Sequence, residues 1–136
     1  MVEITASYEG TLRCSATHGP SGSVVETDAP TDNHGKGERF SPTDMVATAL
    51  GTCMLTTMGI FAQRHDIDLT GSTVKIEKHM TAELPRKIAR IVTHLKITVP
   101  EDHAMRPALE KAALTCPVHL SLHPDVEKPF VIEWAG

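Results

Sequence analysis

Two of the three cysteines stand in positions where thiol redox chemistry is possible. Cys53 lies in a long apolar segment, and Cys116 directly precedes Pro117 at the end of an amphipathic one. A cysteine thiolate attacks the O–O bond of a peroxide, becomes a sulfenic acid, and condenses with a second thiol to give a disulfide. This chemistry requires the two Cα atoms to lie within about 7 Å of each other. The alternative is that both are small core residues, because free cysteine is among the most buried residue types.

The other residues that suggest chemistry carry a weaker signal. Eight histidines invite a metal-site hypothesis, and His119 and His123 are four residues apart. No His-Glu-x-x-His motif occurs, however, and a surface histidine is the ordinary case. Cys14 falls on an early predicted strand, where it is expected to pack. We therefore expect no metal and no bound cofactor.

A long helix is predicted to position Cys53. Ser41 is a suitable N-cap, Pro42 suits the first helical position, and Asp44 suits the positive end of the helix dipole. The helix should run to about His65. Its apolar positions recur at spacings of three and four, and this face includes Val46, Leu50, Cys53, Thr57 and Phe61.

Strands and a second helix account for the rest of the chain. The predicted strands are Val2–Tyr8, Thr11–Thr17, Ser23–Thr27, Ser72–Thr81, Ile88–Val99 and Pro129–Trp134. Met105–Thr115 is an amphipathic helix that should end at Cys116, since a residue before proline disfavours the helical conformation. Asp28–Lys36 is a polar loop. The pattern predicts one α+β domain over residues 1–136.

Composition narrows the classes of protein that are possible. Hydrophobic residues make up 40% and charged residues 22%, which is ordinary globular usage, and the net charge of −4 argues against a nucleic-acid partner. The start, Met1–Ile4, lacks the pattern of a secretory signal, and the odd cysteine count suggests reduced thiols in the cytoplasm. Met45–Ala62 is uncharged and long enough to raise the question of a membrane-spanning helix, but its threonines and glycines lower its mean hydropathy. We expect no membrane partner, and a helix apolar on nearly all sides suggests burial in a homodimer.

Two motifs make the chain resemble the OsmC/Ohr family, in a divergent OsmC-like branch. The first is Arg39 to Cys53 (RFSPTDMVATALGTC), and the second is Cys116-Pro117-Val118-His119 downstream. The predicted order of strands and helices is similar to that family over essentially the whole chain. The resemblance implies an α+β fold in which antiparallel sheets wrap a long central helix, in an intertwined homodimer.

The resemblance also implies an activity. Cys53 would be the peroxidatic cysteine and Cys116 the resolving one, in an antioxidant enzyme of the oxidative stress response that reduces organic hydroperoxides. A dithiol such as dihydrolipoamide would reduce the disulfide. One observation from the residues complicates the two roles: if Cys116 caps the turn after it, the helix N-terminus should lower its pKa.

The family pattern also includes an arginine and a glutamate that activate the thiolate. Thr43 stands where better-known members carry the glutamate, so Glu38 or Asp44 would have to replace it. Arg39, after the glycine-containing loop, is the first candidate for the arginine, and Arg13 is the alternative. Because Thr43 has no charge, a second function is also possible: an OsmC-like ligand-binding or redox-sensing protein with little peroxidase activity.

Overall fold

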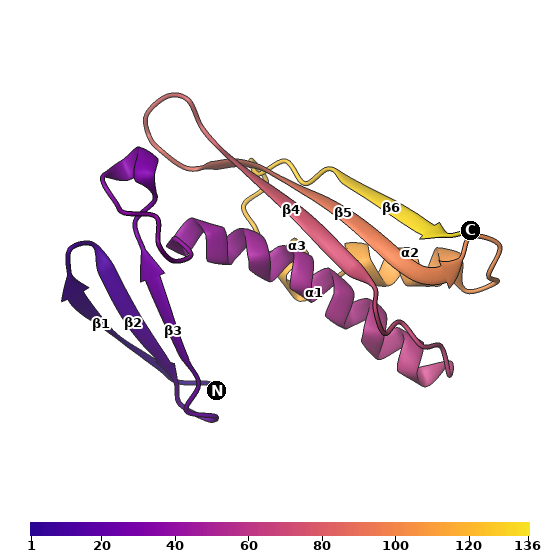
Figure 1. Ribbon diagram of the computed structural model, residues 1–136. Helices are drawn as coiled ribbons and strands as arrows, with labels where there is room; N and C mark the ends of the chain where they lie inside the picture. Colours follow the sequence, from indigo (N-terminus) through magenta and orange to yellow (C-terminus); the bar gives the residue numbers. More distant parts are fainter. The chain divides into compact units, whose positions relative to one another are not determined.

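The computed structural model describes residues 1–136 as two three-stranded sheets and one long helix, an α+β arrangement (Figure 1). Its backbone contacts divide the chain into two compact units, Met1–Val46 (unit 1) and Ala47–Gly136 (unit 2). The single domain expected from the sequence stays a prediction, and the two units are described in turn.

Unit 1 is an antiparallel sheet followed by a short looped segment. Its strands are β1 (Ile4–Gly10), β2 (Arg13–His18) and β3 (Val24–Asp28), in the order β1-β2-β3. A 3-10 turn, η1 (Thr31–Asn33), lies within the loop that was predicted as polar and irregular. The three strands confirm those predicted over residues 2–27, and each pairs antiparallel with the next.

The loop ends in the cap of the long helix α1 (Pro42–Arg64), which begins in unit 1 and continues into unit 2. The Asp44 N–H donates to Ser41 Oγ at 3.0 Å, and the Ser41 N–H donates to Asp44 Oδ2 at 2.9 Å. This reciprocal pair satisfies donors that a helix start leaves without partners. The predicted start at Ser41-Pro42 is therefore confirmed.

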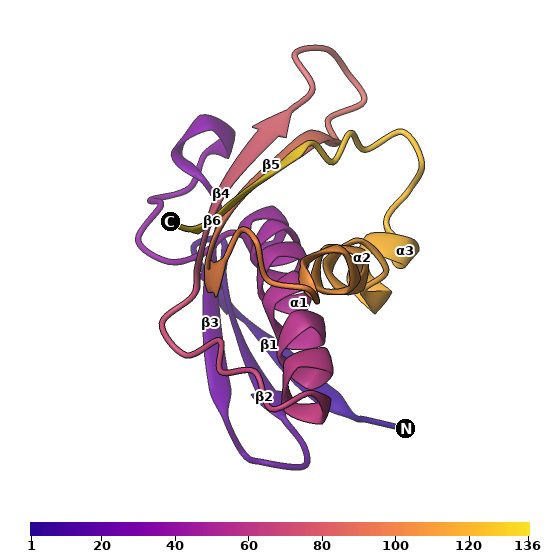
Figure 2. The same ribbon diagram turned by 90° about the vertical axis from the view of Figure 1, so that its right-hand side faces the viewer.

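Unit 2 is a three-stranded sheet with helices on one face (Figure 2). Its strands are β4 (Thr73–Met80), β5 (Ile88–Pro100) and β6 (Phe130–Ala135), and between β5 and β6 lie α2 (Arg106–Leu114) and α3 (Pro117–Ser121). The β4–β5 pair is antiparallel, but β6 runs parallel to β5. The expectation of purely antiparallel sheets is wrong here, because the α2–α3 segment carries the chain across the sheet to re-enter in the same direction.

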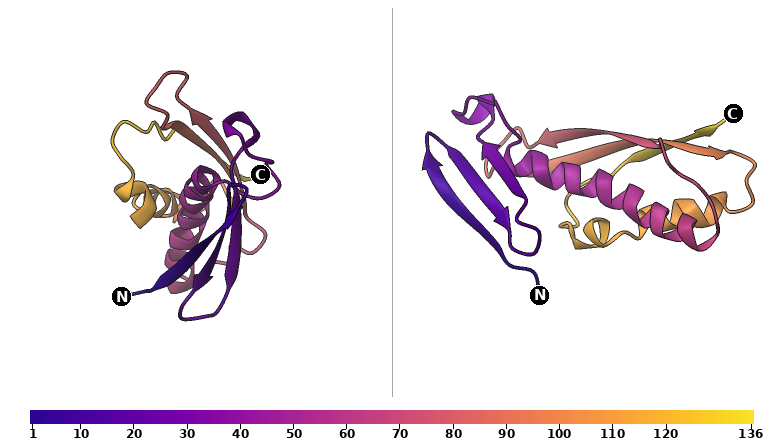
Figure 3. Two further views of the ribbon diagram at one scale, coloured as in Figure 1. Left: turned by 90° about the vertical axis from the view of Figure 1, so that its left-hand side faces the viewer. Right: turned by 60° about the horizontal axis from the view of Figure 1, so that its bottom comes forward.

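The core of unit 2 lies between this sheet and the helices α1 and α2, which run along the same face (Figure 3). Alternation along β5 sends every second residue inward, and the set from Ile91 to Val99 is buried. The largest buried apolar side chains of the helices are Leu50, Met54 and Met58 of α1 and Leu109 of α2. Gly51 brings α1 close to β4, since a Cβ there would collide with the side chain of Ile76.

α1 is long and apolar enough to cross a membrane by length and composition alone. The core helix of a soluble protein meets the same criteria, and Leu50, Met54 and Met58 are each at most 1% exposed. The helix is not covered on every side, however, because Ile60 is 47% exposed and Thr52 and Thr56 are exposed too.

Candidate thiol redox site

The two cysteines of the motifs are neighbours within unit 2. Cys53 lies in the middle of α1, is partly buried, and packs against the core. Cys116 lies between α2 and α3 and is fully buried. Cys53 acts on the pKa of Cys116 both as a hydrogen-bonding side chain and through its charge, so the two side chains adjoin. Both are free thiols.

Cys116 caps the short helix α3 with its sulfur. Its backbone is extended (φ −66°, ψ 148°), and the N–H of His119 donates to Sγ at 3.3 Å. Burial raises the pKa of Cys116, and the adjoining Cys53 raises it further, whereas the N–H groups of His119 and Val118 lower it. The net direction is upward. The capping role is confirmed, but the expectation of a lowered pKa is wrong, because desolvation outweighs two hydrogen bonds from a short helix.

This arrangement separates the two thiols by their surroundings. Cys116 is inaccessible to solvent and is held in its neutral form, so it is a poor nucleophile while it stays buried. Cys53 retains partial exposure beside it. Two such thiols are suited to sequential chemistry, in which the accessible one reacts first and the buried one then condenses with it.

The arginines of unit 1 differ in how firmly they are held. Arg13 Nη2 donates to Asp28 Oδ2 and to Glu38 Oε1, each at 3.2 Å. Asp28 is buried and also accepts the Glu38 N–H at 3.1 Å. The Glu38 N–H and Arg13 both hold the pKa of Asp28 below its ordinary value, and the bond to Asp28 raises the pKa of Arg13. Arg13 is thus fixed between two carboxylates.

Arg39 is held more loosely. Its Nε lies 3.8 Å from Glu26 Oε2, with both side chains 48% exposed, and its Nη1 donates to the Glu38 carbonyl at 2.9 Å. The Glu38 carboxylate contacts Arg13 instead. Asp44, the other expected partner of Arg39, takes part in the helix cap with Ser41. Within unit 1 the structure brings Glu38 together with Arg13 through its carboxylate and with Arg39 through its backbone.

The sequence predicted no role in these networks for two of their residues, Asp28 and His119. Asp28 is directly opposite Arg13 in the β2–β3 register, so the hairpin alignment was a signal that could have found it. His119 carries the N–H that contacts Cys116, and its own pKa is lowered by burial and by Lys128. No group of three or more His, Cys, Asp or Glu side chains is arranged to hold a metal ion. Thr43, at the family's glutamate position, places its hydroxyl 3.2 Å from Ser41 Oγ.

Comparison with known proteins identifies the family. The model of the OsmC-like protein family matches residues 35–128, which include both cysteine motifs. The chain belongs to the OsmC-like family. A solved structure from Psychrobacter arcticus, described as a candidate osmotic-stress-induced and detoxification-response protein, is 41% identical over 98% of this chain and 96% of its own, with a TM-score of 0.91. A comparison with curated protein sequences gives no significant match.

More distant OsmC-like and Ohr structures share the fold. An organic hydroperoxide resistance protein OsmC from Legionella pneumophila is 16% identical, with a TM-score of 0.77, over 98% of this chain and 96% of its own. An organic hydroperoxide resistance protein from Elizabethkingia anophelis is 14% identical, with the same TM-score, over 99% and 96%. The recognition of the OsmC/Ohr family and the predicted α+β fold are therefore confirmed.

Proposed function

We propose that this OsmC-like protein is a cysteine-based peroxidase that reduces organic hydroperoxides. The Cys53 thiolate attacks the outer oxygen of the hydroperoxide, the O–O bond breaks, and the alcohol leaves with a proton while Cys53 becomes a sulfenic acid. The Cys116 thiol then displaces water from that sulfenic acid to form a disulfide. A dithiol such as dihydrolipoamide reduces this disulfide by exchange and is itself oxidised.

The adjoining positions of Cys53 and buried Cys116 carry this proposal. The burial of Cys116 supports the order of the two steps, because the peroxide meets the partly exposed Cys53 thiol first. The names of the distant neighbours, which refer to hydroperoxide resistance, point to the same substrate class. Reduced free thiols also fit a cytoplasmic location.

The proposed reaction needs a cation that favours the thiolate of Cys53, because Cys53 lies in mid-helix, away from the N-terminus of its own helix. We propose an arginine of unit 1 for this role. Arg39 with Glu38 or Asp44 is the assignment that the sequence favours. Arg13 is the alternative with the better-organised guanidinium, since two carboxylates hold it. The rate of peroxide reduction by Arg39→Ala and Arg13→Ala proteins decides between them, because the activating arginine is the one whose loss slows the reaction about tenfold or more.

A homodimer is part of the proposal. α1 has no charged side chain between Asp44 and Arg64, yet Ile60 and the threonines on the same side are exposed in a single chain. A second copy of α1 would cover this side. Sedimentation at micromolar concentration should give a dimer.

Thiol titration tests the peroxidase directly. Cumene hydroperoxide should remove two thiols per chain, faster than hydrogen peroxide does, and dihydrolipoamide should restore both. Cys53→Ser should prevent the loss, whereas Cys14→Ser is the matched control and should leave the loss of two thiols intact. An unreactive wild-type protein, or loss that persists in Cys53→Ser, would exclude the proposed mechanism.

A second function is favoured by one observation. Thr43 offers no carboxylate at the position where the family's glutamate activates the reaction. A ligand-binding or redox-sensing protein would therefore keep the two thiols with little turnover. It would lose its thiols once with hydroperoxide but show no sustained consumption of peroxide when dihydrolipoamide is supplied in excess.

A further inference from the structure

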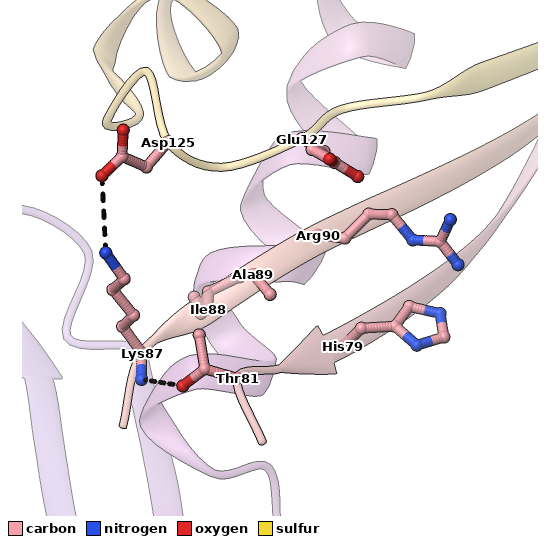
Figure 4. Close-up of a pocket in the computed structure, with 8 residues that line it drawn as sticks. All are labelled: His79, Thr81, Lys87, Ile88, Ala89, Arg90, Asp125 and Glu127. Carbon is pink, nitrogen blue, oxygen red and sulfur yellow. Dashed lines mark hydrogen bonds and ion pairs between the residues drawn. The ribbon is translucent and has the colours of Figure 1, made fainter. Parts of the chain in front are cut away.

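A cavity of about 530 Å³ lies at the end of the unit 2 sheet where β4 and β5 are joined (Figure 4). One wall is the β4–β5 connection, in which the Lys87 N–H donates to Thr81 Oγ1 at 3.1 Å. The other wall is the connection from α3 to β6, in which the Asp125 N–H donates to His123 Nδ1 at 3.0 Å. Each wall therefore has a hydrogen bond of its own, and the cavity between them is open to solvent.

A row of three titratable side chains crosses this end of the sheet. His79 of β4 is opposite Arg90 of β5, and Arg90 forms a parallel bridge with Glu127. Opposite residues of an antiparallel pair share a face, with their Cβ atoms about 4.5–5.5 Å apart. A register irregularity follows His79, and such bulges re-aim side chains. Figure 4 shows the His79 ring and the Arg90 guanidinium extending the same way along the sheet.

Only some of the basic side chains that line the cavity have a partner. Lys87 Nζ lies 3.4 Å from Asp125 Oδ2, so this cation has a partner. The side chains of Arg90 and His79 form no ion pair or hydrogen bond with any residue of the chain, although Glu127 is the strand neighbour of Arg90. A guanidinium with five donors and an imidazole therefore face the cavity without partners.

We propose that this cavity binds a small monocarboxylate, whose carboxylate lies between Arg90 and His79. The planar guanidinium matches a carboxylate with two parallel hydrogen bonds. Glu127 and Asp125 on the rim repel a phosphate, which carries up to two negative charges at neutral pH, more than they repel a single charge. Ile88 and Ala89 line the cavity and offer apolar contact to a short carbon chain or ring. The volume is within the range of small-molecule sites.

Calorimetric titration of the full-length protein tests this site, with hexanoate and benzoate as probes and inorganic phosphate as the competing chemistry. Saturable binding of one carboxylate per chain is expected. Arg90→Gln should weaken it by about tenfold or more, and Glu127→Gln should strengthen it several-fold, because a repelling charge is removed. Lys96→Gln is the matched control, a cation on the same sheet outside this cavity. It should leave the affinity unchanged.

Three results would overturn the proposal. One is the absence of saturable binding by either carboxylate, and another is an affinity that Arg90→Gln does not change in a protein with a wild-type circular dichroism spectrum. The third is phosphate binding that is as tight as carboxylate binding and equally sensitive to Arg90→Gln. Because the site does not include Cys53 or Cys116, the peroxidase assay and this titration succeed or fail independently.

Discussion

Replacing Gly51 by alanine tests how closely α1 approaches β4. A Cβ at this position would lie 2.7 Å from Ile76 Cγ1 and 3.3 Å from Val74 Cγ1. Alanine in place of glycine within a helix stabilises it by about 1 kcal/mol, whereas overpacking a core costs about 1–3 kcal/mol. The collision involves Cγ1, which moves only by a change of χ1, and χ1 is restricted in a β-branched side chain such as that of Ile76. We therefore expect Gly51→Ala to lower the free energy of unfolding by about 1 kcal/mol.

The same substitution should raise, rather than lower, the free energy of unfolding once the colliding side chain is shortened. In an Ile76→Ala background the collision is removed and only the milder contact with Val74 remains, so the gain in helix propensity dominates and Gly51→Ala should stabilise the protein by up to about 1 kcal/mol. The coupling between the two sites is then about 2 kcal/mol. Urea denaturation of the four proteins at one fixed concentration measures it, since a dimer's stability depends on concentration. If Gly51→Ala is stabilising by the same amount in both backgrounds, the close packing of α1 on β4 is refuted.

Three further predictions concern the cap, a buried carboxylate and the resolving thiol. Ser41→Ala removes the reciprocal cap of α1 and should destabilise the protein by about 1 kcal/mol, seen as a lower Tm; an unchanged Tm contradicts the cap. The pKa of Asp28 lies below its ordinary 3.8, so its contribution to stability is complete above that pH and is lost as the pH falls through the folded-state pKa. In Asp28→Asn, stability followed by circular dichroism should therefore fall less steeply as the pH is lowered. An unaltered loss of stability at acid pH argues against the network. Because the pKa of Cys116 is raised above 9.0, disulfide formation in stopped-flow should accelerate as the pH rises from neutral through that value, and a flat profile would count against this.

Most helices and strands of the fold could be predicted from local patterns in the sequence. The Ser41-Pro42 start of α1 was readable because capping depends on residues that are close in sequence. The strand β5 was predicted from its content of alternating apolar residues, and its inward positions, such as Ile91 and Leu95, are buried. These signals do not depend on what lies across the sheet.

The features that sequence missed depend on pairings distant in the chain. The parallel direction of β6 is set by the path of α2 and α3. The residues of β6 itself do not indicate in which direction it runs beside β5. The pKa direction of Cys116 was wrong because its burial could not be weighed against its capping position. Asp28 appeared as an ordinary loop-edge aspartate until its register with Arg13 was known. The row of His79, Arg90 and Glu127 also exists only through strand register.

The disulfide between Cys53 and Cys116 is the most direct test of the proposed chemistry. The wild-type protein is treated with one equivalent of cumene hydroperoxide, its remaining thiols are alkylated, and the digest is analysed by mass spectrometry. We predict a linked pair of peptides that contains Cys53 and Cys116 and lacks two hydrogen atoms, with Cys14 alkylated. A disulfide that contains Cys14, or a Cys53 oxidised to sulfinic acid beside an alkylated Cys116, would contradict the account.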